Sequence, residues 1–336
     1  MNSFAVGVDL GGTNMRIAAV ERGGTQLATL QAATDLKRGR DLILAELCSG
    51  VRDLVQRFAP DRQLIGIGVG VPGIIDLETG TVHSAANLPG WSDYPVRQEL
   101  EKRLQVPVVL ENDANCAAMG EQWLGAGQGV DDLCMITLGT GVGGGFVVRG
   151  RPWHGLMGMA GELGHMTVVP DGTPCGCGSR GCLEQYASAT AIKRMALEAV
   201  ASNQAPGLTR AVAENPGFDA RAVFDCYRQG DPAARAIFES VGSALGIAMA
   251  NLVNALNLPL HVIGGGVAKA WEAFSPALFR ELTRRSIVFR AGEFRKVRHK
   301  ATMVVPTDLH GSAGVLGAAR LALLLEQPST WRSEAV

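Results

Sequence analysis

The chain has 336 residues, of which 47% are hydrophobic and 19% charged, and its 31 basic side chains nearly balance 32 acidic ones. A net charge of −1 argues against a nucleic-acid-binding or membrane-surface protein, because both classes usually carry a basic excess or a basic patch. A single hydrophobic core stops growing near about 250–300 residues, so this length favours two lobes.

The N-terminal sequence and one long uncharged stretch bear on the cellular compartment. MNSFAVGVDLGG has neither the charged start nor the apolar segment of a secretory signal peptide. Residues 240–268 carry no formal charge, but they include asparagines and a proline, which favours a buried helix and a strand over a membrane span. We expect a cytoplasmic protein without a membrane partner, in which clustered cysteines indicate metal binding before disulfides.

The first third of the chain alternates strands and helices. FAVGVDL (4–10) predicts a strand, GGTN a glycine turn and MRIAAV a second strand. Apolar residues at helical spacing predict a helix over 41–58, and LIGIGVGV predicts a buried strand that ends in a Pro-Gly turn. VPVVL (106–110) predicts a strand, 111–113 a polar corner, and the following residues a helix from about 114.

The remaining chain repeats this alternation. DLCMITLGTGVGGGFVVRG (132–150) has the strand, glycine turn and strand of the N-terminus. Residues 187–256 have a helical pattern. LPLHVIGGGVAKAW then predicts a strand, a glycine turn and the start of a helix. The chain closes with MVVPT and a final predicted helix, GVLGAARLALLLE. Strands that alternate with helices predict α/β architecture with mixed sheets. The repeated strand–turn–strand unit predicts two related lobes.

Three glycine turns are the first candidate binding features. Glycine lets backbone N–H groups approach a phosphate closely, because no Cβ stands in the way. One such turn is more often an ordinary tight turn, but turns at 11–14 and 139–145 with Gly264–Gly266 after a third strand favour a nucleotide. The P-loop motif is absent, and a strand follows GVGGG where a Rossmann fingerprint needs a helix. Backbone amides, hydroxyl groups and Mg²⁺ would therefore bind the phosphates and balance their negative charge. Asp9, at the end of the first strand, is placed to hold Mg²⁺ through water.

The polar corner ENDAN (111–115) has two interpretations. Asp113 stands just ahead of a predicted helix, where a carboxylate commonly caps the helix N-terminus. Asn112 beside it offers a donor and an acceptor suited to a pair of sugar hydroxyls. Phosphoryl transfer to an alcohol also needs one positioned carboxylate to accept the hydroxyl proton. Position alone favours the cap.

A histidine and three cysteines have the composition of a zinc site. Cys175, Cys177 and Cys182 fall within eight residues, with His165 ten positions ahead of the first. Four N/S ligands complete a tetrahedral shell, which indicates a structural ion. The alternatives are a disulfide, which the compartment disfavours, and chance clustering. Such an ion would fix the loops that carry Glu162 and Glu184 and shape a polar pocket.

Together these motifs resemble the ROK family (repressors, open reading frames, kinases) of sugar kinases. The resemblance runs from VDLGGTNMRIA (8–18) to GSAGVLGAA (311–319), and its most specific parts are VPGIID, ENDAN, TLGTGVGGG, GELGHM and CGCGSRGCLE, in order and correctly spaced. It implies a two-lobed actin-like and hexokinase-like ATPase fold of the ribonuclease H type, with mixed sheets flanked by helices. The small lobe would comprise residues 1–117 plus 311–330, and the large lobe residues 118–310 with the zinc motif and the adenosine-side glycine turn.

The resemblance also implies a role for each motif. The first phosphate loop would contain Asp9, Gly11, Gly12 and Thr13, the second Thr137, Gly139, Thr140 and Gly141, and Gly265 and Gly266 would lie on the adenosine side. Asn112, Asp113, Glu162, His165 and Glu184 would bind the sugar, with Gly73 in support. Asp113 would be the general base for the sugar 6-hydroxyl as it attacks the γ-phosphate of Mg²⁺-ATP. His165, Cys175, Cys177 and Cys182 would hold structural Zn²⁺.

Within the family the sequence is most similar to bacterial glucokinases, on NLPGW (87–91) and the CGCG-x-x-GCLE form. N-acetylglucosamine, N-acetylmannosamine, fructose and allose stay open as substrates, because pocket shape separates such sugars. The partners would be a sugar, ATP and further copies of the chain, since the family commonly forms homodimers or homotetramers.

Two other classes are weighed against a kinase. Repressors of the family use the sugar pocket as a sensor and carry an N-terminal helix-turn-helix, whereas the first phosphate strand here begins at residue 4. A non-catalytic sensor is disfavoured because Asp113 and both phosphate loops are intact. A metalloenzyme acting through the zinc is disfavoured by the closed ligand shell.

Overall fold

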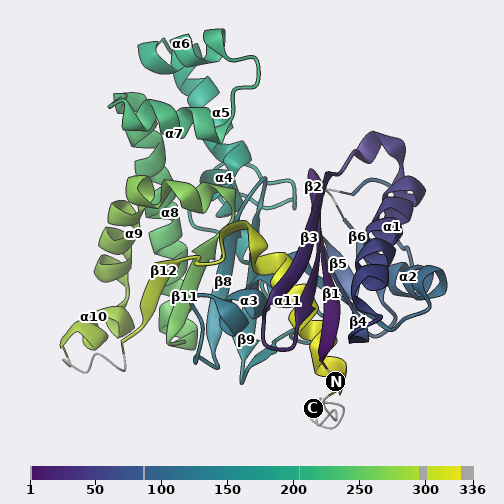
Figure 1. Cartoon of the computed structure of the whole chain (residues 1–336). Helices are drawn as coiled ribbons and strands as arrows, with labels where there is room; N and C mark the ends of the chain where they lie inside the picture. Colours follow the sequence, from purple (N-terminus) through teal and green to yellow (C-terminus); the bar gives the residue numbers. More distant parts are fainter. Residues whose placement is uncertain (1, 86–87, 204, 295–300, 327–336) are drawn as a thin grey trace. The chain divides into compact units, whose positions relative to one another are not determined.

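The computed structural model describes residues 2–85, 88–203, 205–294 and 301–326 (Figure 1). Contacts divide the chain into two compact units: unit 1 holds the residues up to Met135, Gly145–Gly161 and those from Asp308 on, and unit 2 holds Ile136–Gly144 and Glu162–Thr307. The division passes through β8 (Leu133–Leu138) and β9 (Val142–Val148). The lobe boundaries expected above stay a prediction, and residues 1, 86–87, 204, 295–300 and 327–330 of those ranges, which include Asn87 of NLPGW, lie outside the described residues.

Unit 1 contains a five-stranded sheet, a two-stranded sheet, one short strand of a second five-stranded sheet, and helices. The strands are β1 (Ser3–Leu10), β2 (Asn14–Glu21), β3 (Gln26–Ala33), β4 (Gln63–Val71), β5 (Ile74–Asp76), β6 (Thr81–Ser84), β7 (Val108–Asn112) and β10 (Arg151–Pro152). The helices are η1 (Leu36–Arg38), α1 (Arg40–Phe58), α2 (Val96–Leu104), α3 (Asp113–Leu124), η4 (His310–Ser312), α11 (Ala313–Leu323) and η5 (Leu324–Glu326). The expected strand–turn–strand opening and the helix over 41–58 are therefore confirmed.

Helices α1 and α11 lie on opposite faces of the sheet that contains β1 (Figure 1), and the residues of β1 alternate between them. The apolar residues at positions 4, 6, 8 and 10 share a core with buried residues of α1. Gly7 faces the other way, where a Cβ would lie 2.1 Å from the Val315 carbonyl oxygen of α11. Gly68 of β4 faces α11 as well, since its Cβ would lie 1.8 Å from the Ala318 oxygen. Strand glycines thus let α11 lie directly on the sheet, beneath the end of β1 that carries Asp9.

Strand β7 ends later than the sequence predicts. The expected strand was 106–110 with a helix from about 114, whereas β7 covers Val108–Asn112 and α3 begins at Asp113. Glu111 and Asn112 stay in the strand because they pair with Gly70 and Val71 of β4. The corner therefore contains no loop residues, and strand passes directly into helix.

Unit 2 is mainly helical in the described residues. Its helices are η2 (Leu163–His165), α4 (Glu184–Ala187), α5 (Ala189–Ala201), α6 (Pro206–Glu214), α7 (Ala220–Arg228), α8 (Pro232–Leu256), η3 (Gly266–Ala270), α9 (Trp271–Arg285) and α10 (Ile287–Phe294), and its complete strands are β11 (Leu260–Gly264) and β12 (Met303–Pro306). By length and composition α8 is the one described helix that passes as a membrane span, but 67% of the apolar window is buried. Gly242 and Gly246 bring α8 against α9, so this apolar surface packs inside the unit.

The two five-stranded sheets have the same topology: when the strands of each sheet are numbered along the chain, both sheets have the order 3-2-1-4-5. The first has the order β3-β2-β1-β4-β7, and the second has the order β10-β9-β8-β11-β12. In the first sheet β1, β2 and β3 pair antiparallel while β1, β4 and β7 pair parallel. In the second, β9 and β10 pair antiparallel and β11 and β12 parallel. The internal repeat and the α/β class with mixed sheets are thereby confirmed.

Candidate functional site

The first glycine turn joins β1 to β2 in unit 1. The Gly11 N–H donates to the Asn14 carbonyl at 2.9 Å, and Thr13 and Asn14 are exposed. Asp9 stands one residue before the end of β1 on the face that packs on α11. Gly314 leaves the room that it needs, because a Cβ there would lie 2.7 Å from Asp9 Oδ2. An acidic side chain and an exposed backbone turn thus lie at one strand end.

The electrostatics of Asp9 fit a cation. Burial, and after it the negative charge of Asp113, raise the pKa of Asp9 to about 7, although Arg16 partly opposes both. A bound divalent ion reverses this balance, because it stabilises the ionised carboxylates. Carboxylate oxygens are also the protein ligands that Mg²⁺ takes. The residues present therefore fit the Mg²⁺ expected from the sequence.

Asp9→Asn is expected to stabilise the protein without ligands at pH 8, but not at pH 4. The folded chain keeps the Asp9 proton up to a pKa of about 7, whereas an unfolded chain releases it at about 3.9. Between these values the unfolded state binds fewer protons, so the wild-type free energy of unfolding falls as pH rises and stays low above pH 7. Thermal unfolding should show the variant about 3 °C or more above wild type at pH 8. Asp53→Asn, at an exposed ion pair with Arg57, is the control, and an equal Asp9→Asn difference at both pH values would contradict the argument.

The strand-to-helix corner is held by Asn112. Its Oδ1 accepts the backbone N–H of Ala114 at 2.9 Å and that of Asn115 at 3.4 Å, so Asn112 caps α3. The alternative that Asp113 is the cap is therefore wrong, because the chain enters the helix one residue earlier than expected. Asp113 is the first residue of α3, and its Oδ1 accepts the Ala114 N–H at 2.9 Å. Both side chains thus accept the Ala114 N–H at the start of α3, and Asn112 provides the cap.

Gly73 joins the same corner from the Pro-Gly turn after β4. Its carbonyl accepts the Asn112 side-chain N–H at 3.3 Å. Gly73 has a φ of +113°, and a Cβ there would lie 2.2 Å from the Ser84 oxygen, so no other residue fits. The structure thereby brings the predicted Gly73, Asn112 and Asp113 together.

Glu111 and His154 also belong to this corner, although the sequence assigned neither of them a role. Glu111 is 4% exposed, and His154 Nε2 lies 2.7 Å from its Oε2. A carboxylate next to the apolar run VPVVL was the available signal, because a buried charge needs a partner. The partner lies 43 residues away in the sequence, which local spacing does not reveal.

The second and third glycine turns meet in unit 2. The second turn, between β8 and β9, is closed by the Gly139 N–H to the Gly141 carbonyl at 2.9 Å. Gly265 has a φ of +84°, and its Cβ would lie 2.4 Å from the Leu138 oxygen, so a side chain would not fit. The structure therefore places Gly265 and Gly266 beside the turn that follows Thr137 and Leu138. These are the residues expected on the phosphate and adenosine sides of a nucleotide.

Helices α4 and α5 hold the second turn. Glu184 Oε2 accepts the Val142 N–H at 3.0 Å, and the Thr190 hydroxyl donates to the Thr140 carbonyl at 2.7 Å. The Ala189 N–H donates to the Gly139 carbonyl at 2.8 Å. Gly141 must lack a side chain, because a Cβ would lie 2.4 Å from Glu184 Oε2. Glu184, predicted as a sugar ligand, is therefore also bonded to the turn predicted to bind phosphate.

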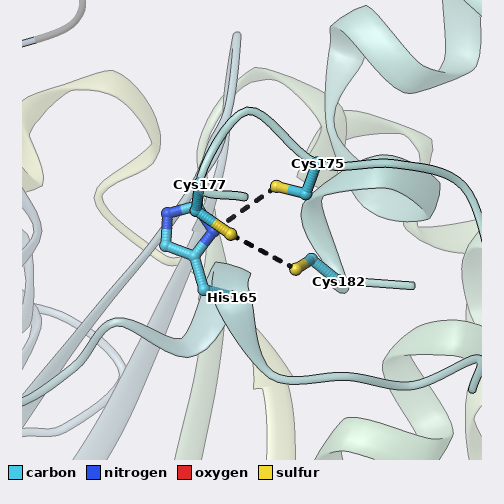
Figure 2. A group of neighbouring side chains, drawn as sticks. All are labelled: His165, Cys175, Cys177 and Cys182. Atoms are coloured by element: carbon cyan, nitrogen blue, oxygen red, sulfur yellow. Dashed lines mark hydrogen bonds between the residues drawn. The ribbon is translucent and has the colours of Figure 1, made fainter. Parts of the chain in front are cut away.

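The four predicted metal ligands gather in unit 2 (Figure 2). The nearest ligand atoms of His165, Cys175, Cys177 and Cys182 all lie within 4.8 Å of one another. Cys175 Sγ is 3.7 Å from His165 Nδ1, and Cys177 Sγ is 3.7 Å from Cys182 Sγ. A tetrahedral Zn²⁺ at about 2.3 Å from sulfur separates its ligand atoms by about 3.8 Å. The cysteines are free thiols, so the donor set fits zinc.

Local turns shape this cluster. The Cys175 N–H donates to the Ser179 carbonyl, and Gly181, with a φ of +69°, lies so close to Val169 that a Cβ would be 1.7 Å from its oxygen. A hydrogen bond from the Ser179 backbone, and then one from Cys175, lower the pKa of Cys177. Burial raises the pKa of Cys182 to about 12. A metal ion would remove that rise, because a coordinating thiol is deprotonated.

His165 connects the cluster to Glu162. Its Nδ1 faces Cys175, and its Nε2 lies 3.8 Å from Glu162 Oε2. The side chains of His165 and Glu162 are 37% and 50% exposed, so both are accessible to a ligand. Gly164 between them packs on β9, since a Cβ would lie 2.2 Å from the Val142 oxygen. A metal ion bound to Nδ1 would therefore fix the imidazole ring of His165, with its Nε2 directed toward Glu162.

Comparison with known proteins agrees with this geometry. A glucokinase from Halalkalibacterium halodurans is 40% identical over 318 residues, which cover 94% of each chain. A glucokinase from Thermotoga maritima is 36% identical over 94% of this chain and 96% of its own. The crystal structure of a ROK family glucokinase from Streptomyces griseus, in complex with glucose and AMPPNP, is 34% identical, with a TM-score of 0.78 over 96% of this chain and 99% of that one.

The likeness to solved structures confirms the actin-like, hexokinase-like fold class that the sequence motifs implied. The family model matches residues 5–324, which include every predicted site residue. On both grounds, the chain belongs to the ROK family.

Proposed function

We propose that the chain is an ATP-dependent sugar kinase that transfers the γ-phosphate to the 6-hydroxyl of glucose. The observation that carries the proposal is the β7–α3 corner, which places Gly73, Asn112 and the carboxylate of Asp113 together at the start of α3. Similarity to glucokinases at up to 40% identity over nearly the whole chain supports glucose as the substrate.

Asp113 is the general base in this proposal. It accepts the proton of the sugar 6-hydroxyl as that oxygen forms a bond to the γ-phosphorus and the bond to the ADP oxygen breaks. Asn112 and Gly73 help to hold the sugar, and their mutual hydrogen bond keeps the acceptor corner rigid. Such positioning raises the rate, because the reacting atoms are already aligned and lose less entropy in reaching the transition state.

The glycine turns bind the nucleotide. Asp9, Gly11, Gly12 and Thr13 form one phosphate loop, Thr137, Gly139, Thr140 and Gly141 form the other, and Gly265 and Gly266 lie on the adenosine side. Mg²⁺ bound with the nucleotide supplies charge neutralisation on the phosphates, and Asp9 would hold it through water. Backbone amides and the threonine hydroxyls donate to phosphate oxygens.

Glu162, His165 and Glu184 complete the sugar ligands. His165, Cys175, Cys177 and Cys182 would hold Zn²⁺ in a structural role, because four protein ligands close the shell. The support is the convergence of their ligand atoms within 4.8 Å. The ion would stiffen the segment that carries Glu184 two residues beyond Cys182.

Glu184→Ala is expected to raise the KM for glucose at least about tenfold, and the KM for ATP about threefold or more. The second effect follows because Glu184 bonds the Val142 N–H of the phosphate turn at 3.0 Å. Steady-state kinetics with each substrate varied in turn provide the measurement. Glu198→Ala, which removes only an exposed pair with Arg194 on α5, should change both values less than about twofold. An unchanged KM for ATP in Glu184→Ala would show that the hydrogen bond from Val142 to Glu184 does not affect ATP binding by the turn.

A coupled ADP-release assay across a sugar panel tests the function. The panel contains glucose, fructose, allose, N-acetylglucosamine and N-acetylmannosamine, each with Mg²⁺-ATP. We expect the highest kcat/KM for glucose and little ADP release without sugar, because a bound sugar is needed to complete the site. If none of the five sugars supported ADP release, the proposal would be refuted. A preference for an acetamido sugar would correct the identity of the substrate.

We further propose a cytoplasmic homodimer or homotetramer. The resemblance to the family supports both the compartment and the assembly. Light scattering coupled to size-exclusion chromatography measures the assembly, and a monomer at micromolar concentration would contradict it.

A further inference from the structure

A buried carboxylate stands directly ahead of the proposed catalytic corner. Glu111 is the residue before Asn112 on β7 and is 4% exposed. The charges of Glu111, Asp9 and Asp113 all act on the Cys116 thiol, whose pKa burial and these three carboxylates raise. Three acidic groups thus share one small region of unit 1. Such a group stays buried only if hydrogen bonds satisfy its oxygens.

Both Glu111 oxygens have partners. Oε1 accepts the Asn112 backbone N–H at 2.9 Å and the Asn115 side-chain N–H at 3.0 Å. Oε2 lies 2.7 Å from His154 Nε2, a short distance for a charge-assisted hydrogen bond. The carboxylate therefore connects the last residue of β7, the first turn of α3 and the segment after β10.

The arrangement acts on the residues that surround Asp113. Asn112 caps α3 and bonds Gly73, and Asn115 lies one turn into the helix. Glu111 bonds both of these asparagines, so it sets the direction in which the strand enters the helix. His154 in turn holds the carboxylate from outside the corner. Its own segment is tied down, because the Trp153 N–H donates to the Phe146 carbonyl and the Ala160 N–H to the His154 carbonyl.

We propose that His154 and Glu111 form a positioning pair that fixes the Asn112–Asp113 corner for proton transfer from the sugar hydroxyl. This inference rests on the proposed function. Neither residue touches a reacting atom in the proposal, and both act through the corner. His154 supplies the hydrogen bond that anchors Glu111, and Glu111 transmits that anchor to the backbone of Asn112.

The charge state of the pair agrees with this role. Burial lowers the pKa of His154, but the hydrogen bond and the negative charge of Glu111 outweigh it, so the pKa lies above its usual value. The protonated imidazole is thus favoured beside the Glu111 carboxylate, which strengthens the hydrogen bond between them.

Two substitutions of His154 separate the hydrogen bond from the side-chain volume. His154→Phe keeps a ring but removes the donor, and His154→Gln keeps a donor for Glu111. We expect His154→Phe to lower kcat about 30-fold, with KM values for glucose and ATP changed less than about threefold, because only the transition state needs the aligned base. His154→Gln should recover kcat to within about fivefold of wild type.

Glucose titration calorimetry distinguishes positioning from a folding defect. The binding stoichiometry of His154→Phe should remain that of wild type although kcat falls. The matched control is His83→Phe, because His83 Nδ1 lies 3.0 Å from Asp93 Oδ1 at the surface, where the two side chains are 52% and 80% exposed. It should leave kcat within about twofold.

If His154→Phe fails to fold, Glu111→Asp takes its place, because it keeps the charge but shortens the reach to His154. It should lower kcat about tenfold with stoichiometric glucose binding.

Three results would overturn the inference: wild-type kcat in His154→Phe, a stoichiometry that falls in proportion to kcat, or no recovery in His154→Gln. Wild-type protein without sugar kinase activity would instead remove the proposed function, and this inference with it.

Discussion

Asp113→Asn is expected to lower kcat by about 10²–10⁴-fold while glucose still binds. The substitution removes the proton acceptor but keeps a side chain of the same size, and an asparagine oxygen can still accept the Ala114 N–H that Asp113 Oδ1 meets at 2.9 Å. The helix cap is unaffected because Asn112 provides it. Coupled kinetics measure kcat, and titration calorimetry measures glucose affinity.

The control for this substitution is Asp219→Asn. Asp219 caps α7 through the Arg221 and Ala222 N–H groups, and asparagine caps equally well. The control should therefore retain wild-type kcat and thermal stability. Turnover within about tenfold of wild type in Asp113→Asn would remove Asp113 from the role of base.

Cys177→Ser is expected to reduce bound zinc from about one ion per chain to a small fraction, and to raise the KM for glucose at least about tenfold. The thiol lies 3.7 Å from Cys182 Sγ, and Glu184 follows two residues later. Loss of the ion would loosen His165 and the start of α4 together. The KM for ATP should rise less, since Ala189 and Thr190 still hold the second turn.

Elemental analysis and steady-state kinetics on the same preparation test this expectation. Cys226→Ser is the control, because Cys226 is a free buried cysteine on α7 of the same unit, outside the metal cluster. It should keep the zinc content of wild type. Fully active wild-type protein that contains no zinc would contradict the metal assignment.

Residues close together in the chain were predictable from sequence. The metal cluster spans 18 residues, and its cysteine spacing already brings three thiols into one loop. The glycine turns after β1 and β8 follow from an apolar run that ends in closely spaced glycines, which are poor strand formers but suit close turns. Such patterns act over a few residues, where backbone sterics decide the conformation.

Contacts between distant segments were decided by the tertiary structure. LIGIGVGV predicts a buried strand but not what covers it, and Gly68 of that strand faces the Ala318 backbone of α11, 250 positions later. The cap at Asn112 was misassigned because β7 pairs with β4 for longer than its apolar residues suggest. Pairing in a sheet supplies hydrogen bonds that side-chain composition does not display.

The sequence by itself determined the α/β class, the repeated strand–turn–strand unit, the family and most candidate site residues, because each is written in short runs of residue types. Only the tertiary structure decided that His154 satisfies Glu111 and that Glu184 bonds the Val142 amide, pairs that lie 43 and 42 residues apart. The physical reason is that a buried charge requires a partner but does not specify where along the chain it comes from. The folded backbone makes that choice.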